Sequence, residues 1–225
     1  MKNIYRIGSC RTDYLNLKNN INTNTPNGNF THTTKEALQL IDLLNNNLNI
    51  TECDFPLAFQ TFIKNKDIYI EQFKKADIIL IEISSIKLVS DSKGIYYNIV
   101  ELNKNYKHNY NNVNYEWFEN ESKLDHKKMS TAEIYNDIQL LKKKINKPII
   151  FQGHINLLCN INSDRQIIDD ALKNEKSIIF NNLCDRYELI CTKKDNDQID
   201  KNHLNEYGYK LLYDKFMEIL KLISS

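Results

Sequence analysis

The sequence feature that most limits the possible folds is the apolar run Ala-Asp-Ile-Ile-Leu-Ile-Glu-Ile at residues 76–83. β-branched residues dominate it and polar residues bound it, which is typical of a strand buried on both faces of a parallel sheet. Shorter candidate strands stand at 4–7 and 147–154, with an apolar run at 177–180. Segments with helical periodicity separate them, at 33–44, 131–144, 164–174 and 205–223. This alternation predicts an α/β fold whose parallel sheet is covered on both faces.

Length and charge exclude several classes of protein. With 225 residues the chain can bury one good core, and we interpret residues 1–225 as a single domain. Its 30 basic and 29 acidic residues nearly cancel, so charge gives no indication of a nucleic-acid partner. No apolar run approaches the ~20 residues of a membrane span, and no signal-peptide pattern opens the sequence. We therefore expect a cytoplasmic protein without a membrane span.

The cysteines argue against both disulfides and zinc. There are five, an odd number, and none has the CxxC spacing of a zinc site. We expect reduced thiols and no metal.

The first candidate for chemistry is the sequence Ile-Gly-Ser-Cys-Arg at residues 7–11. A strand that enters a tight turn at Gly8 and continues into a helix would place Ser9 or Cys10 at the helix N-terminus. Free N–H groups there favour an anion, either a thiolate or an oxyanion. The N–H groups from Gly8 to Arg11 are therefore candidates for stabilising a tetrahedral oxyanion.

The second candidate lies near the other end, at Asp200-x-x-His203. A carboxylate three residues before a histidine, at the start of the last helix, can orient one imidazole nitrogen while the other faces a nucleophile. By itself this motif is common. Together with a nucleophile near residue 10 it forms the smallest set that acyl transfer needs.

Other polar residues follow predicted strands or precede a helix. His32 precedes a helix with capping-box spacing between Thr33 and Glu36, either as a site residue or as an ordinary polar residue. Because ligands collect at the carboxyl ends of parallel strands, further candidates follow two of the strands. These are Ser84 and Ser85, which are otherwise turn residues, together with Glu82 at the end of the same strand, and Gly153, His154 and Asn156. Residues 90–127, rich in tyrosine and asparagine, suggest an inserted lid or hairpin.

The two end motifs together resemble the first and last sequence blocks of the SGNH (GDSL-like) hydrolase superfamily. The matching sequences are Ile7-Gly8-Ser9-Cys10 and Asp200-x-x-His203-Leu204-Asn205-x-x-Gly208. The resemblance implies a flavodoxin-like three-layer α/β/α sandwich. Members are mainly esterases, and some are acetyltransferases that act on carbohydrates and surface polysaccharides.

The chain departs from the family pattern in two places. The first block is usually Gly-Asp-Ser, so alignment on Gly8 places Cys10 at the nucleophile position, whereas a shift of one residue would place Ser9 there. We favour Cys10 because this alignment keeps the turn glycine in place. The family's Gly-x-Asn block is not recognisable, so oxyanion donors would have to come from Ser84 or Ser85, or from Gly153, His154 and Asn156.

A cysteine nucleophile favours transfer over hydrolysis, because acyl exchange between a thioester donor and a protein thiol is nearly isoenergetic. We expect the helix N-terminus and His203 to lower the Cys10 pKa. Arg11 would hold a phosphate of the donor or of a sugar nucleotide, or form a surface ion pair.

The leading hypothesis is a transferase that moves an acetyl group from acetyl-CoA to a sugar or sugar nucleotide in surface-glycan biosynthesis. The alternatives are a carbohydrate or lipid esterase that uses the same residues, and a non-catalytic binding module. Acceptor identity and oligomeric state stay open.

Overall fold

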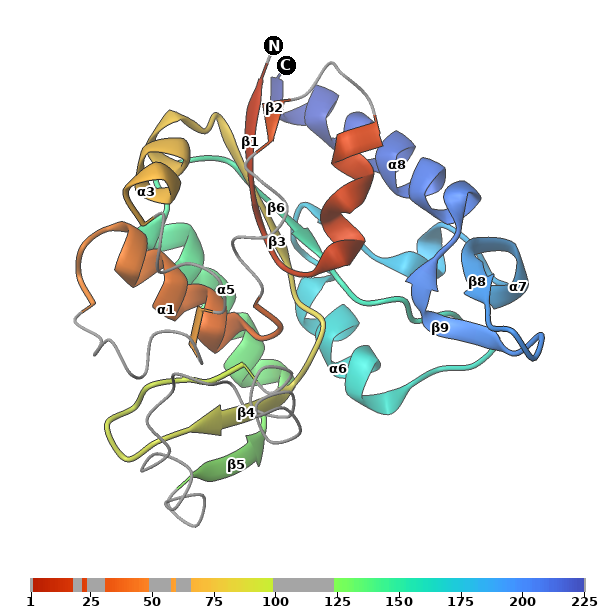
Figure 1. Ribbon diagram of the computed structural model, residues 1–225, viewed down its shortest axis with the longest axis horizontal. Coiled ribbons are helices and arrows are strands. Elements are labelled where there is room, and N and C mark those ends of the chain that lie inside the picture. The colour runs from red at the N-terminus through yellow and green to blue at the C-terminus, as the bar shows by residue number, and fades with distance from the viewer. Residues whose placement is uncertain are drawn as a thin grey trace.

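A five-stranded parallel sheet forms the centre of the molecule (Figure 1). The computed structural model describes residues 2–17, 22–23, 31–48, 58–59, 66–98 and 124–224. The strands are β1 (Asn3–Ile7), β2 (Asn22–Thr23), β3 (Ile78–Glu82), β6 (Ile149–Gln152) and β7 (Ser177–Ile178). Their spatial order is β2-β1-β3-β6-β7, which is the flavodoxin-like order 2-1-3-4-5 when the sheet strands are counted along the chain. The predicted α/β class is confirmed.

Helices cover both faces of this sheet, so the molecule has three layers (Figure 1). One face is covered by α1 (Thr34–Leu44), α3 (Lys66–Lys75), α5 (Thr131–Lys144) and α6 (Ser163–Leu172). The other is covered by the 3-10 helix η1 (Cys10–Leu17), α7 (Tyr187–Ile190) and α8 (Glu206–Ser224). A further 3-10 turn, η4 (Phe180–Asn182), follows β7. The predicted α/β/α sandwich is therefore confirmed.

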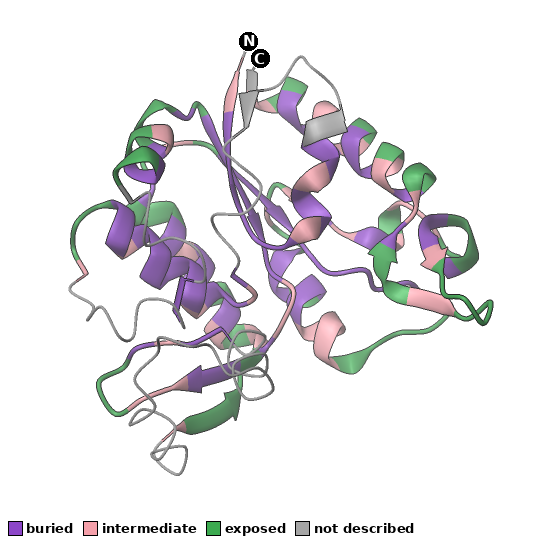
Figure 2. Cartoon of the chain, viewed as in Figure 1, coloured by how far each residue is buried: buried purple, intermediate pink, exposed green. Residues whose placement is uncertain are grey.

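Side-chain alternation along β3 divides the core in two. Ile79 and Ile81 belong to the cluster with α1 and α5, whereas Ile78 and Leu80 belong to the cluster with η1 and α8. The two central strands β3 and β6 are buried throughout, as Figure 2 shows. Successive strand residues point to opposite faces, so Glu82 continues the series of Ile78 and Leu80 toward η1. A carboxylate therefore lies beneath η1, inside the fold.

Two helices begin at side-chain caps, of which the sequence indicated the one at Thr33. Ser130 and Glu133 form a full capping box at α5, with Ser130 N–H donating to Glu133 Oε2 at 2.8 Å and Glu133 N–H donating to Ser130 Oγ at 3.3 Å. At α1, Thr33 caps the Glu36 N–H at 3.2 Å. The Glu36 carboxylate, however, accepts from the N–H of His32 rather than from that of Thr33. The cap of α1 thereby also fixes the segment before it.

Two antiparallel ribbons lie outside the central sheet, and neither was predicted. β4 (Lys87–Ser90) pairs with β5 (Asp125–Lys128), and β8 (Cys191–Lys193) pairs with β9 (Ile199–Leu204). The expected insertion at 90–127 falls mostly on 99–123, which lie outside the described residues. Residues 22–23 form the edge strand β2, which pairs with β1.

Candidate active site

The turn after β1 is built around the carboxylate of Glu82. Gly8 has a φ of +147°, a backbone conformation that residues with a side chain rarely adopt. A Cβ at Gly8 would lie 2.5 Å from the Cβ of Glu82 and 3.0 Å from its Oε2. Glycine is therefore required for the chain to turn this close to Glu82, which is fully buried.

Ser9 binds the same carboxylate through its main chain and its side chain. Its N–H and its hydroxyl each donate to Glu82 Oε2 at 2.6 Å. Hydrogen bonds to an ionised, buried acceptor are stronger than those between neutral groups. To serve as a nucleophile, the buried Ser9 would have to give up its hydroxyl hydrogen bond to Glu82. This geometry favours Ser9 as a residue that holds the turn.

Arg11 completes the cluster and is not a surface residue. Its Nε pairs with Glu82 Oε1, and its Nη1 donates to the main-chain carbonyl of Asn202 at 3.2 Å. Gln152 Nε2 donates to the Arg11 carbonyl at 3.4 Å. The Arg11 side chain is only 7% exposed, so the alternative of a surface ion pair is wrong. Removing one member of such a buried pair is costly, because the other charge is left uncompensated.

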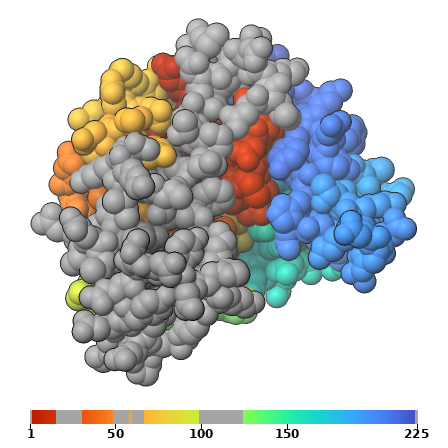
Figure 3. Space-filling view, in the orientation of Figure 1, coloured from red at the N-terminus to blue at the C-terminus, as the bar shows by residue number. Residues whose placement is uncertain are grey.

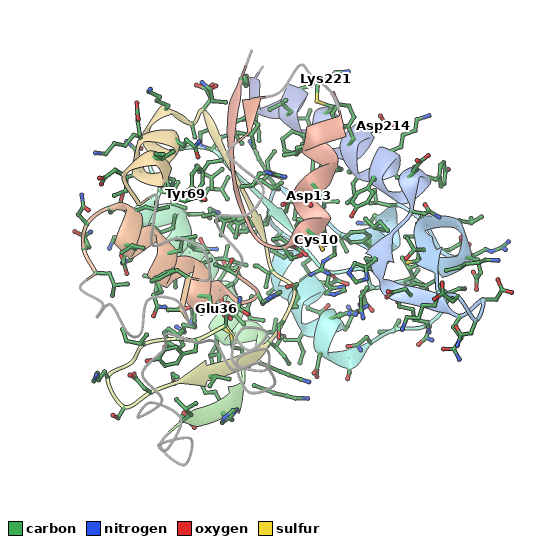
Figure 4. The ribbon with its side chains drawn as sticks, in the orientation of Figure 1. Cys10, Asp13, Glu36, Tyr69, Asp214 and Lys221 are labelled. Atoms are coloured by element: carbon green, nitrogen blue, oxygen red, sulfur yellow. The ribbon has the colours of Figure 1, made fainter. Side chains whose placement is uncertain are left out.

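Cys10 is the first residue of η1, and its side chain is half-buried (Figure 4). Its main-chain N–H has no hydrogen-bond partner among the described residues. Burial raises the pKa of the thiol above its ordinary value; Arg11 opposes this rise, and Glu82 and Asp13 add to it. The expectation of a lowered pKa is therefore wrong, since burial outweighs the neighbouring cation. The thiol is protonated at neutral pH and needs a base.

Helix α8 lies beside the Cys10 turn, and it brings Tyr209. In the space-filling view, η1 and the C-terminal part of the chain meet at the surface (Figure 3). Burial, followed by the charges of Cys10 and Asp13, raises the pKa of Tyr209 to about 12. A neutral phenol therefore stands within electrostatic reach of the thiol. Nothing in the sequence distinguishes this tyrosine from the other twelve, because the sequence holds 13 in all.

The β8–β9 ribbon carries an irregularity at the predicted histidine. Cys191 pairs with Leu204, yet the next residue, Thr192, pairs with Asp200. Residues 201–203 therefore bulge out of the ladder. We expected the Asp200-x-x-His203 motif at the start of the last helix; instead it lies in β9, because α8 begins only at Glu206.

The bulge brings Asp200 and His203 together. Asp200 Oδ2 lies 2.9 Å from His203 Nδ1, and Asp200 Oδ1 accepts from the Asn202 N–H at 3.0 Å. The hydrogen bond from His203 is the main cause that lowers the pKa of Asp200. With an ionised carboxylate as its partner, Nδ1 of a neutral His203 carries the hydrogen and Nε2 is left as an acceptor. A ring in this state can accept a proton from a nucleophile.

Two arginines hold this bulge against the rest of the site. Arg11, from the nucleophile turn, donates to the Asn202 carbonyl across 191 residues of sequence. Arg165 donates through Nη2 to Asn202 Oδ1 at 2.5 Å and through Nη1 to the Lys201 carbonyl at 3.2 Å. The bulge with His203 therefore lies beside the turn with Cys10. Within the described residues, no hydrogen bond joins His203 to Ser9 or Cys10.

His32 and Ser84 form a second contact between segments far apart in sequence. The His32 Nδ1 lies 2.8 Å from Ser84 Oγ, and the N–H groups of Ser84 and Ser85 donate to the His32 carbonyl at 2.8 and 2.9 Å. The segment before α1 is thus fixed to the end of β3. Both serine N–H groups are therefore already hydrogen-bonded and are not available to stabilise an oxyanion.

His154, directly after the Gly153 that follows β6, is a buried histidine. Within the described residues its Nδ1 has no hydrogen-bond partner. Burial, then the charges of Arg11, Arg165 and His32, holds its pKa well below the ordinary value. His154 is therefore neutral, and it lies within electrostatic reach of all three of those side chains.

Gly153 and Asn156 make hydrogen bonds that stabilise the fold. The Gly153 N–H donates to the Ile178 carbonyl at 3.0 Å, and a Cβ there would lie 2.9 Å from Asp169 Oδ1. Asn156 Nδ2 donates to Asp169 Oδ2 at 2.8 Å, and its Oδ1 accepts from the Asn162 N–H at 2.9 Å. Of the predicted oxyanion donors, the main-chain N–H groups of Gly8 and Cys10 and Nδ1 of His154 have no hydrogen-bond partner among the described residues.

The residues that follow His203 anchor the bulge to the last helix. Leu204 is buried, and Asn205 Oδ1 accepts from the Gly208 N–H at 2.9 Å, as an N-cap does. Asn205 Nδ2 donates to the carbonyls of Leu189 and Cys191 at 2.8 and 3.2 Å. The Leu-Asn-x-x-Gly sequence therefore has a structural explanation here.

Within the described ranges, two further features are absent. No helix is long and apolar enough to cross a membrane. No group of three or more histidine, cysteine or acidic side chains is close enough together to hold a metal ion.

Comparison with known families shows which family the chain belongs to. Residues 2–126 match the family model described as the TviD N-terminal domain, which is more than half of the sequence. The chain belongs to the TviD N-terminal domain family. The match to that family includes Gly8–Arg11, His32, Glu82 and both serines after β3, whereas Arg165 and the Asp200–His203 pair lie beyond it. No curated protein and no solved structure matched the chain.

Proposed function

We propose that this member of the TviD N-terminal domain family is an acyltransferase with an SGNH-like site, which moves an acetyl group from acetyl-CoA to a sugar hydroxyl or amine. The observation that carries the proposal is the hydrogen bond from Arg11 to Asn202 at 3.2 Å, which joins the Cys10 turn to the His203 bulge. The family name points to polysaccharide-related biosynthesis, such as that of the Vi antigen or a capsule. A role in modifying glycans is compatible with that name.

Cys10 is the nucleophile in this proposal. Its hydroxyl-bearing neighbour Ser9 is buried and bound to Glu82, while the Cys10 side chain is half-buried and free of hydrogen bonds to carboxylates among the described residues. The raised thiol pKa means that a base must take the proton as the bond forms. His203, oriented by Asp200, is that base.

The first half-reaction forms a thioester on the protein. His203 Nε2 takes the proton from Cys10 Sγ, and the sulfur attacks the carbonyl carbon of the acetyl group. The tetrahedral oxyanion then collapses, the bond from carbon to the CoA sulfur breaks, and CoA leaves with the proton from His203. The Cys10 N–H, which has no partner among the described residues, is an available main-chain donor for the oxyanion.

The second half-reaction transfers the group. His203 takes the proton of the acceptor hydroxyl or amine, whose oxygen or nitrogen attacks the acetyl carbon on Cys10. The Cys10 sulfur leaves and recovers the proton from His203. Water as the acceptor would give an esterase or thioesterase, so the same residues support the alternative of hydrolysis.

The test is intact-protein mass spectrometry after brief incubation with acetyl-CoA. We expect one acetyl adduct on the wild type, which Cys10→Ala and His203→Ala lose and Ser9→Ala retains in part. Cys159→Ala is the matched control, because Cys159 is an exposed thiol outside η1 and chemical acetylation would depend on it. An adduct that survives Cys10→Ala contradicts the covalent mechanism. Hydrolysis of a simple acetyl ester without any adduct would favour the esterase, and inactivity in both assays a non-catalytic module.

A further inference from the structure

A second pocket lies next to the proposed site, between the end of β3 and the start of α6. Its volume is about 180 Å³, which is enough for a small polar group. One wall is the connection from β3 to β4 and the other is the first turn of α6. The lining residues are Ser84, Ser85, Ile86, Lys87, Asn162, Asp164, Arg165 and Ile168.

Arg165 brings a positive charge to this pocket, and this charge also acts on the carboxylate of Asp169 further along α6. The guanidinium donates to the carbonyl oxygens of Ile155 at 2.5 Å, Lys201 at 3.2 Å and the Asn202 side chain at 2.5 Å, and it also interacts with the phenol of Tyr187. No ion pair with an acidic side chain is formed within the described ranges. Arg165 is partly buried, and removing a cation from water without a counter-ion is unfavourable. An anionic ligand would supply the missing negative charge.

The other charges of the pocket also favour an anion. Lys87 is exposed and has no acidic partner among the described residues. The single acid, Asp164, is paired with Lys128 at 3.0 Å. Ser85 Oγ accepts from the Lys87 N–H at 3.0 Å, which leaves the hydroxyl hydrogen free to donate. The N-terminus of α6, a helix of 10 residues, adds its positive dipole end.

The position of the pocket indicates which substrate carries the anion. Arg165 contacts the bulge at Asn202, next to His203, and Ser84 contacts His32, so the pocket borders the reaction centre. In acetyl-CoA the whole pantetheine arm separates the thioester from the phosphates. An anion held this close to His203 therefore belongs to the acceptor and not to the diphosphate of the donor.

We propose that the pocket formed by Ser85, Lys87 and Arg165 binds an oxyanion, a carboxylate or a phosphate, carried by the acceptor sugar. This inference rests on the proposed function for its assignment to the acceptor, while the binding itself is independent of turnover. Bidentate recognition by a guanidinium suits both a planar carboxylate and a phosphate.

Binding is tested by calorimetric titration of the intact chain at constant ionic strength. The probes are glucuronate, glucose 1-phosphate and, as the neutral match, glucose. We expect one or both anionic sugars to bind at least about tenfold more tightly than glucose, as loss of a charge-assisted hydrogen bond implies. Tighter binding of glucuronate would identify a carboxylate, and tighter binding of glucose 1-phosphate a phosphate.

Three variants locate the site. Arg165→Gln should weaken anion binding about tenfold or more and Lys87→Gln by a smaller factor, with glucose unchanged. Lys87 is exposed, so its variant tests the pocket even if Arg165→Gln disturbs the bulge. Lys93→Gln removes the same charge from the turn after β4, outside the pocket, and should leave binding unchanged. Equal affinity for all three sugars, or equal effects of Lys87→Gln and Lys93→Gln, would overturn the proposal.

The acetyl-adduct assay separates this proposal from the proposed function. An acetyl adduct on Cys10 without selective anion binding would refute the pocket and leave the transferase intact. Selective anion binding that Lys87→Gln weakens supports the pocket even where no adduct forms. If the adduct forms and anion binding is selective, the anionic sugar should accept the acetyl group. Lys87→Gln should then raise the KM for that sugar while changing kcat little.

Discussion

Arg11 Nη1 donates a hydrogen bond of 3.2 Å to the main-chain carbonyl of Asn202, and Arg11 Nε pairs with the buried carboxylate of Glu82. One guanidinium thus links the turn after β1, the end of β3 and the β9 bulge. These segments meet at the carboxyl ends of β1 and β3, the strands between which the order of the sheet reverses. Open α/β sheets bind their ligands at such a point.

Replacing Arg11 with lysine should separate the two halves of the site. A lysine keeps the positive charge beside Glu82 but has a single nitrogen, which cannot also reach Asn202 with the geometry of a guanidinium. We expect Arg11→Lys to slow formation of the acetyl adduct by about tenfold or more while the chain still folds. Mass spectrometry over time gives the rate, and thermal unfolding gives the stability. Arg186→Lys, at an exposed arginine, is the control. An unchanged rate would mean that Arg11 does not position the bulge.

Gly8→Ala should destabilise the chain far more than the same change at Gly94. Both glycines have positive φ, +147° and +80°, so both variants incur backbone strain. At Gly94 a Cβ would have no atom within 4 Å, whereas at Gly8 it would lie 2.5 Å from Glu82 Cβ. We expect a loss of about 1 kcal/mol at Gly94 and of about 3 kcal/mol or more at Gly8, measured by urea unfolding. Equal losses would show that the turn can move away from Glu82.

The strand and helix pattern of the chain was predictable because it depends on local periodicity. The run of isoleucines in β3, the capping box at Ser130 and the apolar stripe of α8 each depend on residues close in sequence. The ribbons β4–β5 and β8–β9 escaped prediction because their strands are short and mostly exposed. β5, for example, is Asp-His-Lys-Lys, with four exposed side chains and no apolar alternation.

The candidate site was predictable only in part, and for a related reason. Gly8 is informative because glycine is rare in this chain, and Asp200 and His203 are close in sequence, so their hydrogen bond has a local cause. Glu82 left a weak signal, as a carboxylate at the end of a buried apolar strand. Arg165 left none. Its role comes from contacts with Ile155 and with the bulge 36 and 37 residues away, which no local pattern indicates.

Glu36 should make the chain less stable as the pH rises toward 8. Its side chain is buried at the start of α1 (Figure 4), and burial raises its pKa from 4.5 to about 8. Between these two values the folded chain holds a proton on Glu36 that the unfolded chain has lost. The free energy of unfolding should therefore fall by about 1.4 kcal/mol per pH unit in this window.

The variant Glu36→Gln isolates this effect. Glutamine is neutral and can keep the hydrogen bonds to the His32 N–H and the Thr33 hydroxyl. Asp169, whose pKa burial raises to about 6, contributes a slope of the same sign at lower pH and remains in the variant. Urea unfolding between about pH 6 and 8 should thus show a falling stability for the wild type and a flatter profile for Glu36→Gln. Parallel profiles would contradict a buried proton on Glu36.

Cys10 should react as a protonated thiol in the resting protein, which distinguishes it from thiolate nucleophiles that are formed in advance. Burial raises its pKa above the ordinary value of 9, and the charge of Asp13 adds to the rise while that of Arg11 opposes it. The rate of alkylation by iodoacetamide, followed at the Cys10 peptide by mass spectrometry, should reach half its maximum above pH 9. Asp13→Asn should shift this midpoint downward, because it removes a negative charge near the sulfur. A midpoint below about pH 8, the lower end of the range for a free cysteine, would show a thiolate stabilised by the turn and would remove the need for His203 as base in the first half-reaction.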